Sequence, residues 1–216
     1  MKKVAVILSG CGVFDGSEIH EAVCTLLALD LAGAEYTCFA PNILQKQVIN
    51  HLTHEVKNEK RNVLEEAARI ARGKISDIKT ANADTLDAAI FPGGFGAASN
   101  LCNFSEKNTD MVVQPDVLTF AQAMKKQRKP LGFICISPVM ISKIYGPGVE
   151  HTIGYDENTK SAIEKMGGKH IGCAVTQAVT DQEHKVVSTP AYMLANRIGE
   201  TYAGVSQLVA EVLKMA

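Results

Sequence analysis

The chain has 216 residues, of which 46% are hydrophobic, and a formal net charge of −1 at neutral pH. This length is typical of one domain, whose core buries about 70% of the surface that the unfolded chain exposes. A near-zero net charge argues against a basic surface for nucleic acid or for anionic membranes. We therefore expect a single domain over residues 1–216, with no nucleic acid and no membrane among its partners.

The amino terminus and the cysteines indicate a cytoplasmic protein. The apolar stretch at residues 4–8 is too short for the core of a signal peptide and far too short to span a membrane. The six cysteines include no C-x-x-C pair, so neither a zinc ribbon nor a thioredoxin-type pair is indicated. Without a secretory signal we expect reduced thiols. His51 and His54 have no cysteine near them, so we expect no metal site.

Hydrophobic patterning predicts strands that alternate with helices along the chain. Apolar strands are expected, in chain order, at residues 4–8, 36–40, 88–91 and 131–134, followed by an extended piece at 149–153 and a hairpin of 174–179 with 185–188. Helices are expected at 17–31, 62–71, 114–126, 136–144, 158–166 and 194–215. The polar segment 45–83 is interpreted as an insertion that covers part of the sheet edge.

Short strands that are apolar on both faces and alternate with helices are typical of α/β proteins. We predict a doubly wound, mostly parallel sheet with helices on both faces, as in flavodoxin-like folds. Ligands of such sheets bind outside the carboxyl ends of the strands. The loops at residues 9–16, 92–100 and 135–138 reach that edge, so we expect a functional site among them.

Cys135 follows the apolar run 131–134 and precedes a helix with Pro138 in its first turn, where proline is tolerated. A sharp strand-to-helix turn presents a nucleophile above a parallel sheet. The helix dipole and the free N–H groups at such a turn also favour a thiolate. The alternative is a buried, inert cysteine that caps a core strand. From this residue alone the two interpretations stay open.

Two further loops carry groups that would complement a thiolate. Glu18 lies at the start of the first long helix, where its carboxylate is either an acid–base group or a helix cap in a capping box with Asp15. Gly93 and Gly94 follow the strand at 88–91. Their N–H groups would form an oxyanion hole beside the cysteine, or the glycines serve only a tight turn with positive φ.

Taken together, these residues resemble the DJ-1/PfpI superfamily, whose fold is that of class I glutamine amidotransferases. The segment 134–138 is similar to its nucleophile elbow, 93–96 to its oxyanion loop, and Glu18 matches the glutamate that pairs with the cysteine. Longer matches at 15–22, 61–73 and 132–138 resemble one branch, the enhancing-lycopene-biosynthesis or isoprenoid-biosynthesis glyoxalases (sigma cross-reacting protein 27A). This resemblance covers nearly the whole chain.

The resemblance implies a glutathione-independent glyoxalase of the lyase class that acts on a small 2-oxoaldehyde, and a homodimer. Cys135 would add to glyoxal, N–H groups near Gly94 and of Ile136 would hold the oxyanion, and Glu18 would carry a proton. Glycolate would result with no metal or organic cofactor. The alternatives are a redox-responsive cysteine protein and a non-catalytic regulator linked to isoprenoid metabolism.

The residues after the elbow depart from the superfamily pattern. Many members carry a histidine just after the elbow, whereas the residues after Cys135 contain none. Amidotransferase and protease mechanisms need a base beside the nucleophile, so their chemistry is disfavoured. His151 is a possible substitute base, and the alternative is that it lies on an exposed loop with no role in the site. His20 is the other histidine near the site in sequence.

Overall fold

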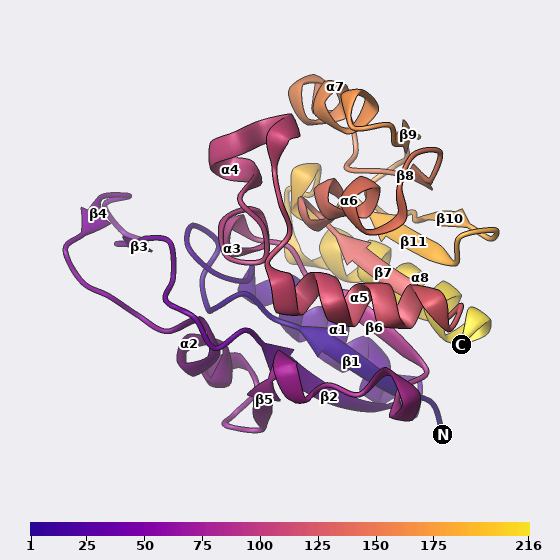
Figure 1. The fold of residues 1–216 in the computed structure, drawn as a ribbon, viewed down its shortest axis with the longest axis horizontal. Coiled ribbons are helices and arrows are strands. Elements are labelled where there is room, and N and C mark those ends of the chain that lie inside the picture. The colour runs from indigo at the N-terminus through magenta and orange to yellow at the C-terminus, as the bar shows by residue number, and fades with distance from the viewer.

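A computed structural model describes all residues, 1–216, and shows a seven-stranded sheet in the order β10-β11-β7-β6-β1-β2-β5 (Figure 1). Every neighbouring pair is parallel except β10 and β11, which are antiparallel. The predicted doubly wound, mostly parallel sheet is therefore confirmed. Its strands are β1 (Lys3–Ile7), β2 (Glu35–Ala40), β5 (Ile75–Asp77), β6 (Ala88–Phe91), β7 (Leu131–Ile134), β10 (Val179–Asp181) and β11 (Val186–Thr189).

Helices cover both faces of the sheet, as Figure 1 shows with α5 in front of the strands and α8 behind them. One face carries α1 (Ile19–Leu31), α2 (Val63–Ile70) and α8 (Ile198–Met215). The other carries α3 (Phe95–Ser99), α5 (Pro115–Lys126) and α6 (Ile141–Tyr145). Two more helices, α4 (Phe104–Lys107) and α7 (Glu157–Lys165), lie together at the top of this view. No helix combines the length and the apolar character that a membrane crossing requires.

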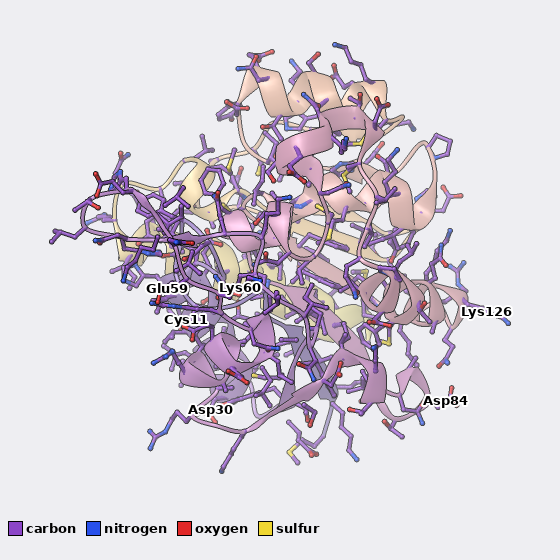
Figure 2. The ribbon with its side chains drawn as sticks, turned by 60° about the vertical axis from the view of Figure 1, so that its left-hand side comes forward. Cys11, Asp30, Glu59, Lys60, Asp84 and Lys126 are labelled. Atoms are coloured by element: carbon purple, nitrogen blue, oxygen red, sulfur yellow. The ribbon has the colours of Figure 1, made fainter.

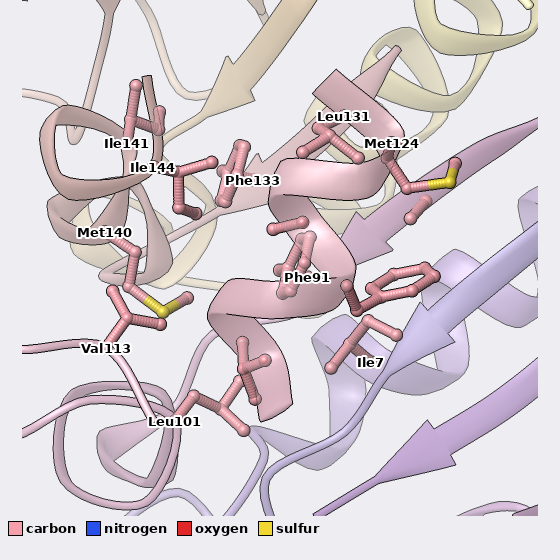
Figure 3. Packing of buried hydrophobic residues seen from close by; sticks show 14 of the residues in the cluster. Ile7, Phe91, Leu101, Val113, Met124, Leu131, Phe133, Met140, Ile141 and Ile144 are labelled. Carbon is pink, nitrogen blue, oxygen red and sulfur yellow. The ribbon is translucent and has the colours of Figure 1, made fainter. Parts of the chain in front are cut away.

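Alternation of side chains along each strand divides the core into two layers, one on each face of the sheet. In β1, Val4 and Val6 pack toward α1 and α8, whereas Ala5 and Ile7 pack toward α5. Phe91 and Phe133 stack on the second face with their ring centroids 4.9 Å apart (Figure 3). Both layers are fully buried, which explains why the strand sequences show no polar alternation.

Several short elements carry too little pattern to be predicted. The segment 45–83 is a crossover rather than one insertion, because its residues form α2 and the edge strand β5. Only the two-stranded ribbon of β3 (Val48–Ile49) and β4 (Val56–Lys57) projects from the body (Figure 1). The extended piece at 149–153 contains β8 (Glu150–His151), which pairs with β9 (Lys169–His170).

Several predicted elements differ in their bounds, and the last helix begins at Ile198 rather than at residue 194. The first strand of the expected hairpin begins only at β10, because residues 174–177 form a turn in which the Gln177 N–H donates to the Ala174 carbonyl. The helix expected at 136–144 begins as a 3-10 turn, Ser137–Met140, before α6. This tighter turn keeps the chain close to the end of β7.

The order of strands places the site. The chain runs outward from β1 to β2 and β5, and then returns to the other side of β1 with β6. This reversal opens a crevice at the carboxyl ends of β1 and β6, where doubly wound sheets bind ligands. The loops after β1, β6 and β7 therefore meet at one edge, as the sequence predicted.

We predict that Gly96→Ala lowers the free energy of unfolding by about 1–3 kcal/mol, because overpacking strains neighbouring backbone. An added Cβ at Gly96 would lie 2.5 Å from the Gly16 Cα and 2.6 Å from the Ser9 carbonyl oxygen. Gly199→Ala is the matched control, because its Cβ would meet no atom within 4 Å. Urea denaturation of both variants tests this; equal stability of the two would contradict the close approach.

Candidate active site

Cys135 lies on a strained turn at the carboxyl end of β7. Its φ is 62°, in the left-handed region that non-glycine residues rarely adopt. Its N–H donates to the Thr189 carbonyl at 2.9 Å. The Ser137 hydroxyl fixes the turn from the other side, because it accepts the Ile134 N–H at 2.8 Å and lies 2.8 Å from the Phe91 carbonyl oxygen. The geometry is that of a nucleophile elbow.

The glycine loop after β6 touches both Cys135 and the loop after β1. A Cβ at Gly93 would lie 2.4 Å from the Cys135 Cβ and 2.6 Å from a carboxyl oxygen of Glu21. Gly94 has a φ of 92°, and a Cβ there would lie 2.3 Å from the Glu18 backbone nitrogen. The two interpretations of this loop are therefore compatible, since the same glycines make a turn and bring N–H groups to the cysteine.

Glu21, which the sequence analysis did not select, is the carboxyl group that contacts the cysteine. It is fully buried and hydrogen-bonds the Cys135 thiol. One carboxyl oxygen accepts the Gly93 N–H at 2.9 Å, and the other accepts the Tyr192 N–H at 3.2 Å. Burial, then the charge of Glu18, raises the pKa of Glu21 from 4.5 to about 8. Glu21 is therefore largely protonated at neutral pH.

Glu18 does not make the contact with the thiol that the sequence analysis expected. It is the N-cap of α1, and its Oε2 accepts the Glu21 N–H at 2.7 Å. The assignment of Glu18 as the partner of the thiol is corrected, because Glu21, one helical turn further, is the carboxyl group that interacts with Cys135. The second carboxyl oxygen of Glu18 lies 4.0 Å from the His20 Nδ1.

The thiol of Cys135 is less acidic than the sequence led us to expect. Burial, then the charge of Glu21, raises its pKa well above the usual value. Hydrogen bonds from the N–H groups of Gly94 and Ile136 act in the opposite direction and lower the pKa without reversing the shift. The resting cysteine is therefore a neutral thiol beside a protonated carboxyl, and a thiolate forms only when the pair loses a proton.

The predicted oxyanion donors separate into two groups. The N–H groups of Gly94 and Ile136 lie beside the Cys135 sulfur, where they lower the pKa of its thiol. The Gly93 N–H is instead occupied by Glu21, so it is not free to hold a substrate oxygen. Gly94 and Ile136 remain as the pair of donors beside the thiol.

A cavity of about 380 Å³ opens in front of the sulfur. Cys135, Glu18, Gly94 and Ile136 all contribute to its wall. Nine residues that the sequence analysis did not select complete it, namely Val13, Phe95, Ala98, Phe104, Ser105, Asp156, Thr159, Tyr192 and Met193. Most come from α3, α4 and α7, short or polar helices whose place over the sheet is set by tertiary packing.

His151 does not reach the site. It is fully buried and absent from the cavity wall. Its Nδ1 lies 3.0 Å from the Val149 carbonyl oxygen, and burial lowers its pKa to about 4. The prediction that it substitutes for a base beside Cys135 is therefore wrong, because β8 carries it into the packing of the second small sheet. His20 lies beside the cavity instead, with its Nδ1 2.8 Å from the hydroxyl of Tyr192, a wall residue.

The other cysteines lie away from this wall. Cys11, in the loop after β1, is half-buried, and burial raises the pKa of its thiol (Figure 2). The remaining four are buried. The structure contains no group of three or more His, Cys, Asp or Glu side chains arranged to hold a metal ion.

Comparison with known proteins shows close relatives. The chain is 43% identical over 223 aligned residues to the mitochondrial ES1 protein homolog of Rattus norvegicus, covering 99% of this chain and 84% of that protein. It is also 43% identical to the mitochondrial glutamine amidotransferase-like class 1 domain-containing protein 3 of Homo sapiens, covering 99% and 83%. No family model matches the chain. The expectation of a cytoplasmic location is wrong on this evidence, because these relatives are named mitochondrial.

Solved structures confirm the fold. A crystal structure of an isoprenoid biosynthesis protein with an amidotransferase-like domain from Ehrlichia chaffeensis matches with a TM-score of 0.94 and 37% identity, over 100% of this chain and 99% of that one. Glyoxalase III from Candida albicans matches with a TM-score of 0.64 at 12% identity, over 99% and 97%. The second likeness shows a common fold alone.

We predict that Glu21→Gln flattens the dependence of stability on pH between about 4.5 and 8. The folded protein holds the Glu21 proton more tightly than the unfolded chain, whose pKa is 4.5, because burial raises the folded pKa to about 8. That contribution to stability is complete below pH 4.5 and is lost as pH rises to about 8. Glutamine does not titrate, so it has no such loss.

Urea unfolding of both proteins across this range measures the difference in their free energies of unfolding. The advantage of the wild type over Glu21→Gln should shrink as pH rises. A difference that stays constant with pH would show that Glu21 has an ordinary pKa.

Proposed function

We propose a glyoxalase function for this chain, which belongs to the ES1 family of glutamine amidotransferase-like class 1 domain proteins, with the DJ-1/PfpI fold. In this proposal Cys135 converts glyoxal to glycolate without a cofactor. One observation carries it: a thiol on a strained elbow faces a cavity, with a buried carboxyl behind it and two N–H donors beside it. This set of groups suits attack on a carbonyl carbon.

The first step joins the thiol to the substrate. The reactive form is the one in which Glu21 is ionised, and this fraction grows as pH rises toward about 8. As the Cys135 sulfur attacks one aldehyde carbon, its proton passes to this carboxylate. The carbonyl electron pair moves onto oxygen. The N–H groups of Gly94 and Ile136, which lie beside the sulfur, stabilise this oxyanion. The product is a hemithioacetal.

The second step moves hydrogen within the substrate and needs no external oxidant. The carbon bound to sulfur loses its hydrogen as a proton to Glu18, and its electron pair forms an enediolate with the neighbouring carbon. The neighbouring carbon then takes the proton back from Glu18, its oxygen takes a proton from water, and the group becomes an alcohol. One carbon is thereby oxidised to a thioester and the other reduced. Water cleaves the thioester, the sulfur regains its proton from Glu21, and glycolate leaves.

Cys135→Ala should abolish glycolate formation from glyoxal, because no other thiol reaches the cavity. Cys173→Ala is the matched control, since this buried cysteine is not part of the wall and its loss should leave turnover intact. Enzymatic or NMR assay of glycolate measures both, and circular dichroism checks that each variant folds. Full turnover by Cys135→Ala would refute the proposal.

Glu21→Gln should lower kcat/KM by about 10²–10⁴-fold, the range for a lost acid–base group. The wild-type rate should rise with pH through about 8, as Glu21 becomes able to accept the thiol proton. In Glu21→Gln this rise should disappear. Glu18→Gln keeps the helix cap but removes the base that takes the carbon-bound proton, so it should lower kcat/KM by about 10²–10⁴-fold as well, while the rise of rate with pH remains. A rise with pH that persists in Glu21→Gln and disappears in Glu18→Gln would reverse the roles of the two carboxyl groups.

A redox-responsive cysteine is the alternative that uses the same residue. Oxidation requires a thiolate and access, whereas Cys135 is only 8% exposed and its pKa is raised by burial. Mass spectrometry after low-dose peroxide distinguishes the two functions. A sensor would oxidise first at Cys135, whereas we expect the half-buried Cys11 to react at least as readily.

A further inference from the structure

We propose that the natural substrate of this cavity is a neutral 2-oxoaldehyde that bears an apolar group of about the size of a phenyl ring, rather than glyoxal itself. This inference rests on the proposed glyoxalase function and specifies its substrate class. Three independent properties of the cavity support it, namely its volume, the chemistry of its wall and the sign of its charge.

The cavity is much larger than glyoxal. Glyoxal has four non-hydrogen atoms and fills roughly the space of two or three water molecules, about 60–90 Å³ at about 30 Å³ each. The cavity holds about 380 Å³, within the range that binds drug-sized ligands. Glyoxal bound at the sulfur would leave most of this space to water, and the far wall could not contribute to positioning it.

Apolar side chains form most of the cavity wall. Phe95 begins α3 and Phe104 begins α4, and both line the cavity together with Met193. Phe95 is 57% exposed, although it follows directly after the glycine loop beside the sulfur. An exposed aromatic ring on a cavity wall gains hydrophobic and ring–ring contacts when an apolar ligand covers it.

The charges on the wall are all negative. Glu18 and Asp156 are its charged residues, and no lysine or arginine lines it. The pKa of Asp156 is lowered by hydrogen bonds from Thr159, so its carboxylate is ionised at neutral pH. An anionic substrate would meet repulsion and lose its hydration without a compensating cation. The cavity therefore disfavours carboxylate- and phosphate-bearing aldehydes.

Phenylglyoxal fits these three requirements and undergoes the same balanced reaction. Sulfur bonds to the aldehyde carbon as the thiol proton passes to Glu21, and that carbon loses its hydrogen as a proton while the ketone carbon gains one and the ketone oxygen takes one from water. The aldehyde carbon is oxidised to a thioester, the ketone carbon is reduced to an alcohol, and hydrolysis releases mandelate. The aromatic ring is on the ketone carbon, one bond from the carbon that binds sulfur, so it would be free to contact the apolar side chains of the wall.

The test compares kcat/KM for glyoxal, phenylglyoxal and 4-carboxyphenylglyoxal. Burial of the ring should make phenylglyoxal about 10- to 100-fold better than glyoxal, and the added carboxylate should remove this advantage. Phe95→Ala should lower the ratio of phenylglyoxal to glyoxal activity by about tenfold. Tyr36→Ala is the matched control, because this exposed aromatic lies on β2 outside the cavity wall and should leave the ratio unchanged.

A binding measurement separates this proposal from the glyoxalase function. Ligand-observed NMR with acetophenone, which lacks the aldehyde, should show binding to the wild type and weaker binding to Phe95→Ala. If no aldehyde is converted but acetophenone binds in this way, the glyoxalase function fails and the apolar ligand class stands. If kcat/KM for glyoxal equals that for phenylglyoxal, the proposed substrate class is wrong. It is also wrong if Phe95→Ala changes neither the ratio of the two kcat/KM values nor the binding of acetophenone.

Discussion

The buried carboxyl group of Glu21 is the interaction on which the site depends. Its two oxygens accept N–H groups from Gly93 and Tyr192, and it hydrogen-bonds the Cys135 thiol. These residues lie in three loops that are far apart in the sequence. Removing the carboxyl would leave the buried Gly93 N–H without a partner, at a cost of about 1–3 kcal/mol, and would also free the part-buried Tyr192 N–H. The same burial raises the pKa of Glu21 to about 8, so the group that assembles the loops is also able to exchange a proton with the sulfur near neutral pH.

Backbone geometry supplies the second condition for the site. Cys135 and Ala191, the residue before Tyr192, both have positive φ, at 62° and 42°. Such conformations cost energy and persist only where the surrounding structure enforces them. Close packing holds the backbone in these conformations. The glycine loop fits against Cys135 and the loop after β1 only because Gly93 and Gly94 lack a Cβ. A thiol is thereby presented to a cavity although its side chain is mostly buried, which allows attack on a small carbonyl compound while limiting access to other reagents.

The fold and the position of Cys135 at the end of a strand could be predicted because local pattern encodes them. A run of apolar residues that ends at Cys135 and continues into a helix start is visible without tertiary information, and so is the alternation of strands and helices. The choice of Glu18 over Glu21 failed because both lie near the start of one helix. The signal that distinguishes them is position on the helix, since Glu21 shares the buried face with Ala22 and Thr25, and a carboxyl on that face must have partners. The cavity wall from Phe104 to Asp156 depends on how short helices pack, which no local pattern specifies.

The carboxyl carbon of Glu21 offers the most direct test of the proton shared with the cysteine. Its ¹³C chemical shift, followed by NMR as pH is raised in the wild-type protein and in Cys135→Ala, reports its protonation. We expect a titration midpoint of about 8 in the wild type, and a changed midpoint when the thiol is absent. A midpoint close to 4.5 in both proteins, the ordinary value for this group, would show that Glu21 is an ordinary carboxylate and that it does not share a proton with the cysteine.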